Sequence, residues 1–468
     1  MEMPTHGSNP AKAEADGADL LPEGAPQSSP PSLGEHSGET HATKYQTAFN
    51  IFGITCFPLA LPFAFGQAGF AAGILLYILI AMAAYLNAWL IADICIRVRL
   101  SPVTYPSIAE AAFGWRGSAL VNICQCLNFF LFSVYALVVI GSSLSQTGTS
   151  VCQNGWIGVI AALLVPFVQI PSFEQLSFLG IVYAILTLVS LVILVQQSAT
   201  EGICDGNDRD YDSISAFSVL SGAVTFGFAF SGSGVFPELI SEMADKREFH
   251  GVFGSLTLSW LVIVPVNLLA GIAGFAAFGN KVSGTVIMDY PQGGARTAAA
   301  ACVSFLLAFA LLESNQVLAL KLERHFGIQD PAAKGAFQGL PPLAARGVVR
   351  TLLLAIQTAV ALGIFNAGAG DLSILCGALG GMPLTFTVPI FCHLRLLPER
   401  SSPVVKKLLI MCAALAMALA VCGVYVGVAG LAGSGSSGGA FGGPCIATTD
   451  TYGETTANYR GNVGRCGW

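Results

Sequence analysis

Eleven apolar segments, each long enough or nearly long enough to cross a bilayer, set the strongest limit on how this chain folds. In hydrocarbon every backbone polar group must be hydrogen-bonded internally, so only helices and closed barrels span a membrane. Segments of this length predict helices. With 54% hydrophobic and 10% charged residues, the composition also argues against a soluble domain. We predict an all-α membrane protein whose spans run Tyr45–Phe65, Phe70–Ile94, Leu120–Leu144, Gly155–Ile170, Leu176–Gln196, Val219–Ile240, Leu256–Phe278, Ala298–Leu320, Val348–Phe365, Leu372–Leu394 and Leu408–Leu431.

The basic residues predict the orientation of these spans. If the N-terminus is cytosolic, 16 Lys and Arg residues lie in cytosolic connections and 5 lie on the other side. Cytosolic loops carry an excess of Lys and Arg, so we predict a cytosolic N-terminus and an extracytosolic C-terminus. The host membrane is a vesicular or vacuolar membrane or the plasma membrane, and the sequence does not choose among them.

The two ends of the chain differ in composition from the middle. Residues 1–44 are rich in Pro, Gly, Ser and acidic residues, which predicts a disordered cytosolic tail without a cleavable signal peptide. Residues 432–468 contain GSGSSGGAFGGP and predict a flexible extracytosolic tail. The membrane-spanning region between them, 45–431, divides into a first half at about 45–196, a second half at about 219–394 and a last helix at about 408–431.

Four of the 13 cysteines fall in predicted extracytosolic segments. An even number of cysteines in an oxidising compartment favours disulfides. Three pairings are possible, and free thiols are the alternative. We expect Cys152 to pair with Cys204 between two loops and Cys445 to pair with Cys466 in the tail.

Two of the spans are interrupted by helix-breaking residues. In the first, Gly53, Pro58 and Pro62 divide the run FNIFGITCFPLALPFAFGQAGF. In the sixth, GAVTFGFAFSGSGVFPELISE carries four glycines and Pro237. Irregular backbone at membrane depth is tolerated where it lines a cavity, and corresponding breaks in two halves of a chain are typical of transporter binding sites. A merely kinked first helix is the alternative.

The ends of interrupted helices expose amide donors and carbonyl acceptors, which together suit a zwitterion such as an amino acid. Both breaks lack Lys, Arg, Asp and Glu, which favours a substrate with an uncharged side chain. Close helix packing is the alternative role for their small residues. The predicted substrate-binding residues are Gly53, Ile54, Thr55, Cys56, Phe230, Ser231, Gly232 and Ser233.

Several motifs resemble the amino acid/auxin permease family and, within it, are most similar to the vesicular inhibitory amino acid transporter group. They occur in the expected order between about Ala48 and Leu397. These motifs are LPFAFGQAGF, TYPSIAEAAFG, FPELISEMADKREF, GFAAFGNKVSGTVIMDYP and VPIFCHLRLLP.

The resemblance implies the leucine-transporter architecture, with two inverted five-helix repeats plus an eleventh helix. It also implies small amino-acid substrates held between helices one and six, over Gly53–Ala60 and Phe230–Gly234. The usual driving force in the family is a proton gradient, and a sodium-coupled permease for amino acids or related small organic solutes is the alternative. The expected partners are the amino-acid substrate and the lipid bilayer. We expect no cofactor, no metal and no nucleic-acid partner, and the sequence does not determine the oligomeric state.

Glu313, in the run LLESNQ, lies inside the eighth predicted span. An acidic residue at membrane depth is costly and normally faces protein or water. Burial away from a cation disfavours the charged form of a carboxyl group, so Glu313 could exchange protons near neutral pH. We hypothesise that Glu313, with Asn315 nearby, carries the coupled proton. A permanently protonated Glu313 hydrogen-bonded to a neighbouring helix is the alternative.

Two other functional classes are considered. A channel would show a filter sequence or rings of pore-lining charge, and neither is evident. An intramembrane protease would need two acids facing each other at membrane depth, whereas Asp212 lies in a predicted loop and Asp371 lies between two predicted spans. A transporter, not an enzyme, is therefore predicted.

Overall fold

The computed structural model describes residues 42–434 apart from 99, 101–102, 148–150, 171–172, 202–214, 292, 329–340 and 365–367. The predicted tails therefore lie almost wholly outside the described residues, as do Cys204, Cys445 and Cys466. Within the described ranges the regular structure is helical, with a single isolated bridge between Ala42 and Met243.

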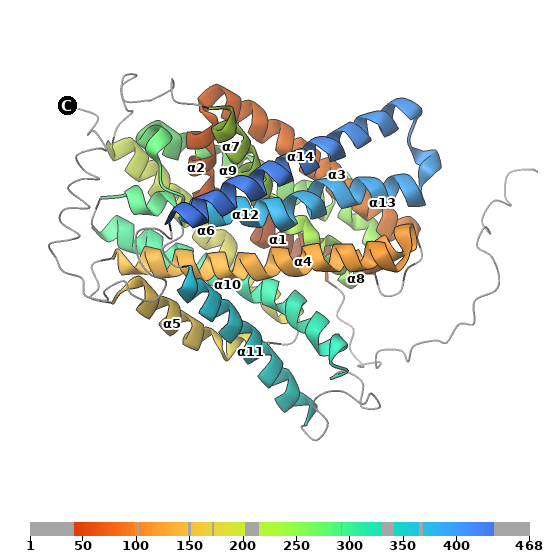
Figure 1. Cartoon of the computed structure of the whole chain (residues 1–468), viewed down its shortest axis with the longest axis horizontal. Coiled ribbons are helices and arrows are strands. Elements are labelled where there is room, and N and C mark those ends of the chain that lie inside the picture. The colour runs from red at the N-terminus through yellow and green to blue at the C-terminus, as the bar shows by residue number, and fades with distance from the viewer. Residues whose placement is uncertain are drawn as a thin grey trace, which may run out of the picture. The chain divides into compact units, whose positions relative to one another are not determined.

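Apart from the fourth, the helices of the first half of the chain cover the predicted spans; Figure 1 shows their arrangement. Thr43 begins the first of them with a capping box, in which its hydroxyl accepts from the Gln46 amide. Gly114, at a φ of 71°, separates a short first part of α4 from its long span. The elements are α1 (Lys44–Thr55), η1 (Pro58–Ala60), α2 (Leu61–Ala68), α3 (Phe70–Arg97), α4 (Tyr105–Ser145), α5 (Gln153–Leu164), η2 (Phe167–Gln169) and α6 (Phe173–Glu201).

The second half contains the second broken helix and, later, a stretch of π-helix. The π-helical turns η8 and η9 interrupt the tenth span, and such turns are frequent at functional sites. The elements are α7 (Ala216–Ala229), η4 (Ser231–Val235), α8 (Phe236–Glu242), η5 (Lys246–Phe249), α9 (Ser255–Phe278), η6 (Gly279–Lys281), η7 (Val286–Asp289), α10 (Gly294–His325), α11 (Pro342–Gly363), α12 (Ala369–Cys376), η8 (Gly377–Gly381), η9 (Pro383–Thr387), α13 (Val388–Leu396), η10 (Pro398–Arg400) and α14 (Pro403–Ser434).

Nine helical segments of the described chain are long and apolar enough to cross a membrane, and the bent pair α7 and α8 makes a tenth. The fourth predicted span, Gly155–Ile170, is occupied by α5, which has only 12 residues, followed by η2. Pro166 lies between these two elements and lacks the amide that would continue the helix. The structure therefore supports about ten spans and does not by itself establish eleven.

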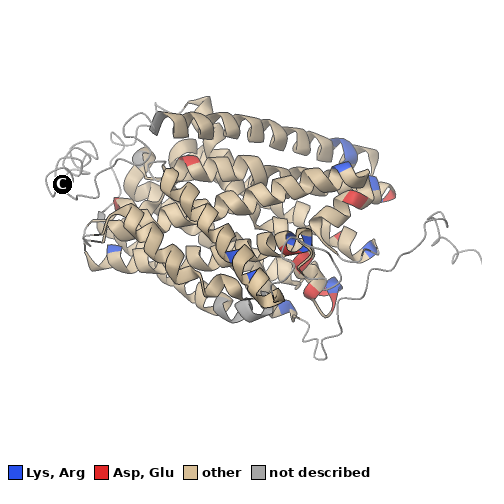
Figure 2. Ribbon diagram, turned by 60° about the horizontal axis from the view of Figure 1, so that its bottom comes forward, with Lys and Arg blue, Asp and Glu red and all other residues tan. Residues whose placement is uncertain are grey.

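Burial separates the central spans from the peripheral ones. The most apolar window of the span formed by α12, η8, η9 and α13 is 78% buried inside the protein, whereas that of α14 is only 22% buried. Around the centre, α4 packs against α10, and α2 packs against α7 and α9. Figure 2 shows a largely uncharged middle with most of the charged residues towards one end of the bundle. This distribution is that of a multi-pass membrane protein.

Candidate functional site

The first break lies between α1 and α2. The helix α1 ends at Thr55, and the chain leaves helical geometry at Cys56 and Phe57. Pro58 then begins the short turn η1, because a proline fits the start of a helix but cannot continue one. Sequence reasoning placed this break correctly but began it too early, because Gly53, Ile54 and Thr55 still belong to the last turn of α1.

The second break lies between α7 and α8. Here α7 ends at Ala229, the residues Ser231–Val235 form a 3₁₀ turn, and the two helices are bent by 40°. Pro237 lies in the first turn of α8, where its missing amide costs no hydrogen bond. The predicted interruption is therefore present.

The two breaks touch each other at Gly232. A Cβ atom at this position would lie 2.6 Å from Ile54 Cγ2 and 2.7 Å from Thr55 Oγ1. It would also lie 2.8 Å from the backbone carbonyl oxygen of Ile54, which no side-chain rotation can move. Only glycine fits this contact without displacing one broken helix from the other.

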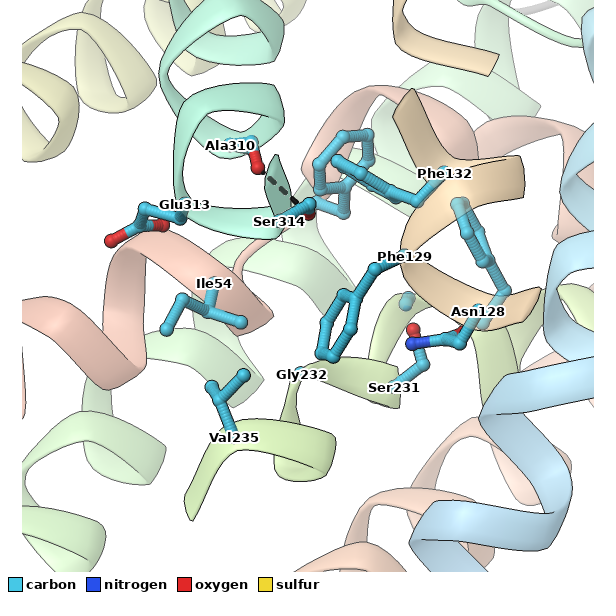
Figure 3. Close-up of a pocket in the computed structure, with 13 residues that line it drawn as sticks. Ile54, Asn128, Phe129, Phe132, Ser231, Gly232, Val235, Ala310, Glu313 and Ser314 are labelled. Atoms are coloured by element: carbon cyan, nitrogen blue, oxygen red, sulfur yellow. Dashed lines mark hydrogen bonds between the residues drawn. The ribbon is translucent and has the colours of Figure 1, made fainter. Parts of the chain in front are cut away.

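A cavity of about 30 Å³ lies where the breaks meet, enough for roughly one water molecule. Figure 3 shows that its wall is formed by α1, α4, the second break and α10. The residues lining it are Ile54, Phe57, Asn128, Phe129, Phe132, Phe228, Ala229, Ser231, Gly232, Val235, Ala310, Glu313 and Ser314.

An aromatic cluster separates this cavity from a second, smaller one. Phe57 packs against Phe132, Tyr135 and Phe228 with ring centroids 5.7 to 6.3 Å apart. The second cavity, which Cys56 and Tyr183 line together with Phe57, lies on the other side of the first break. In this conformation neither cavity could hold an amino acid, so the site is closed.

Polar side chains hold three helices together one turn from the cavity. Gln125 on α4 donates to the carbonyl oxygen of Gly234 at 2.7 Å, and Lys321 on α10 donates to Gln125 Oε1 at 2.5 Å. Lys321 also donates to Asn122 at 2.5 Å. This contact joins α4, α10 and the second break.

Sequence reasoning missed the polar face of α4. Asn122, Gln125 and Asn128 recur every three residues in the apolar run Leu120–Phe132 of α4. Because residues three apart lie on the same side of a helix, this spacing predicts one polar stripe. It was the signal that could have placed Gln125 and Asn128 at the site.

The predicted binding residues do not all face the main cavity. Ile54, Ser231 and Gly232 line it, and Cys56 lines the second cavity. Phe230 instead packs against Tyr77 and Trp260.

The remaining predicted residues make contacts with other elements. The Ser233 hydroxyl donates to Thr385 Oγ1 at 2.7 Å in the π-helical segment. Thr55 is fully buried against Gly232. A Cβ added to Gly53 would lie 3.2 Å from the Phe309 ring and 4.0 Å from a Glu313 carboxyl oxygen.

The two predicted coupling residues lie on different sides of α10. Glu313 is 4% exposed, lies beside the end of α1 and forms no hydrogen bond to another residue that the structure describes. Asn315 accepts hydrogen bonds from Ser133 at 3.4 Å and from Gln357 at 2.7 Å, so it joins α10 to α4 and α11. Among the described residues no group of three His, Cys, Asp or Glu side chains could hold a metal ion.

Two interrupted helices that meet at a closed cavity inside a bundle of spans define the class of this protein as a polytopic membrane protein with a transporter fold. The chain belongs to the transmembrane amino acid transporter protein family, whose profile matches residues 43–434. The members of this family are transporters, not enzymes.

Curated relatives are similar at low identity. Amino acid transporter AVT1D of Arabidopsis thaliana is 25% identical over 70% of this chain and 59% of its own length. Amino acid transporter ANT1 of the same plant is 24% identical over 86% of this chain and 96% of its own length. Vacuolar amino acid transporter 7 of Saccharomyces cerevisiae is 25% identical over 50% of this chain and 48% of its own length. The chain thus spans less than two thirds of some of these relatives.

A solved structure shows the fold. The crystal structure of MhsT in complex with L-phenylalanine matches with a TM-score of 0.59 at 14% identity, covering 83% of this chain and all of MhsT. The leucine-transporter-like arrangement expected from the sequence is therefore the observed one in its helical core.

Proposed function

We propose that this protein is a secondary active transporter that moves small neutral amino acids across a membrane and is driven by a proton gradient. The observation that carries the proposal is the meeting of two interrupted helices at one cavity, with the buried carboxyl group of Glu313 beside the first break. The names of the relatives support amino acids as the substrate class.

The ends of the broken helices supply the groups that a zwitterion needs. A helix that ends within the membrane leaves carbonyl groups without partners, and a helix that begins there leaves amide groups without partners. The cavity meets both kinds of end, through Ile54 at the end of α1 and Val235 at the start of α8. Glu313 is the one ionisable residue among those that line it, which favours a neutral side chain.

Glu313 is well placed to couple substrate binding to proton movement. Figure 3 shows its side chain at the edge of the cavity, with the carboxyl group directed away from Ser314 and Phe129. It lies next to Gly53 on α1, so a change in its protonation state would act directly on the broken helix. A structural Glu313 would be expected to hold a hydrogen bond to a neighbouring helix, and within the described residues it forms none.

The proposal also covers the number of spans, the orientation of the chain and its disulfides. We propose eleven spans, the short α5 and η2 together forming the fourth, arranged as two inverted repeats plus α14. The N-terminus is cytosolic and the C-terminus extracytosolic, in a vesicular, vacuolar or plasma membrane. Cys152 and Cys204 form a disulfide, as do Cys445 and Cys466.

The test uses Glu313→Gln, which mimics the protonated carboxyl group. In proteoliposomes with an imposed pH gradient, this variant should exchange labelled amino acid across the membrane but fail to accumulate it. The control is wild-type protein in the same vesicles with a sodium gradient alone, which should drive no accumulation. Accumulation by Glu313→Gln with an unchanged pH profile would refute proton coupling through this residue.

A further inference from the structure

One edge of the main cavity carries two polar side chains that lack hydrogen bonds. Asn128 is 3% exposed, and its buried Oδ1 accepts no hydrogen bond within the described part of the chain; Ser231 is 8% exposed, and no side-chain hydrogen bond is found for it there. Figure 3 shows both on the side of the cavity away from Glu313. Buried polar groups are nearly always paired, so this arrangement calls for a partner that enters the cavity.

The π-helical segment holds these two side chains in place from behind. A Cβ atom on Gly380 would collide with the Cβ of Asn128, and one on Gly381 would lie 2.9 Å from the Cβ of Ser231. Neither residue can retreat towards η8, because the backbone of that segment already touches it. Their polar ends are therefore preorganised towards the cavity, as a selective site requires.

The rest of this edge is aromatic and uncharged. Phe129 and Phe132 from α4 and Phe228 from α7 cover the space beside Asn128. No Lys, Arg or His lines the cavity, so an acidic side chain would have no counter-charge there.

We infer that Asn128, assisted by Ser231, selects the substrate side chain, and that the preferred substrates are small neutral amino acids bearing a hydroxyl or carboxamide group. This inference rests on the proposed function. The Asn128 amide both donates and accepts, and the Ser231 hydroxyl does the same, so either substrate group can pair with them. A substrate of the same shape without such a group would leave both side chains unpaired, and sites of this kind discriminate strongly against it.

The experiment compares isosteric substrates in proteoliposomes that contain the full chain. Uptake of threonine is measured against valine, and uptake of asparagine against leucine. Wild-type protein should favour the polar member of at least one pair by about tenfold or more in kcat/KM, and the pair that responds tells hydroxyl from carboxamide. Asn128→Leu should reduce that ratio to about one or reverse it. Asn87→Leu, which replaces a buried asparagine of α3 outside the cavity, should keep the wild-type ratio.

A second variant and a binding measurement keep the inference testable if Asn128→Leu misfolds. Ser231→Ala removes only a hydroxyl group and should lower the same ratio by a smaller factor. Thermal stabilisation of purified wild-type protein should be larger with the polar amino acid than with its isostere. Equal wild-type uptake and stabilisation by both members of each pair would overturn the inference while leaving amino-acid transport intact. Absence of uptake for every amino acid would overturn the proposed function and this inference together.

Discussion

Replacing Gly232 by alanine tests whether transport depends on the contact between the two breaks. The added Cβ would lie 2.6 to 2.8 Å from two atoms of Ile54 and one of Thr55. One of these atoms is a backbone oxygen, so the broken helices must separate by roughly 0.6 Å or more to restore an ordinary contact. Larger residues, such as leucine, would force a greater separation.

The free-energy cost of the added methyl group in Gly232→Ala can be estimated from the effects of overpacking in protein interiors. Adding a methyl group to a close-packed interior costs about 1–3 kcal/mol. If that cost falls on the closed conformation through which transport passes, uptake should drop by about 5- to 150-fold. The fold should survive, because α1 and α8 also pack against other elements, α1 against α9 and α8 against α3.

The assay is initial uptake of labelled amino acid into proteoliposomes, normalised to protein abundance and accompanied by a thermal-unfolding scan. Gly158→Ala is the matched control, because a Cβ on this α5 glycine meets no atom within 4 Å. Its uptake should equal that of the wild type. Uptake by Gly232→Ala within twofold of Gly158→Ala would refute the idea that the two breaks must touch during transport.

Three further predictions concern the topology and the loops. Tags at the two termini should lie on opposite sides of the membrane in a protease-protection assay, and protection of both from the same side would contradict the eleven-span arrangement. Non-reducing mass spectrometry should find a peptide that links Cys152 to Cys204, whereas alkylation of both thiols without reduction would rule it out. Burial raises the pKa of Asp289, in the loop before α10, to about 6, although hydrogen bonds from Ser283 oppose this shift. Since the pKa of Asp289 is higher in the folded than in the unfolded protein, stability should fall as the pH rises from about 4 to about 6. In thermal scans Asp289→Asn should lose this part of the pH dependence. An unchanged pH dependence would show that Asp289 is not its source.

The positions of the spans could be predicted from the sequence because the hydrocarbon core of a bilayer requires long apolar helices. The apolar runs predicted every main span, and the prolines at positions 58 and 237 located the two breaks. The prediction was less accurate at α5, where the apolar run is longer than the helix because Pro166 ends regular hydrogen bonding. Such local limits on backbone hydrogen bonding follow directly from the residue types in the sequence.

The residues that line the cavity could not be predicted in the same way. Phe230 and Ser233 lie in the expected break, yet the turn of η4 directs them to Trp260 and Thr385 instead of the cavity. Conversely, Asn128 was not predicted, because the polar stripe of Asn122, Gln125 and Asn128 shows that one side of the helix is polar but not which neighbouring helix that side faces. Its position depends on Gly380, which follows it by more than 250 residues along the chain.

The sequence alone thus determined that this chain forms membrane-spanning helices, that two of them are interrupted and that a carboxyl group is buried at Glu313. These properties follow from local hydropathy and backbone chemistry. Only the tertiary structure decided that Gly232 meets Ile54, that Lys321 joins α10 to α4 through Gln125, and that Asn128 and Ser231 share one edge of the cavity. The physical reason is that a binding site is defined by contacts between helices distant in sequence, and helix packing fixes which side of each helix faces inward.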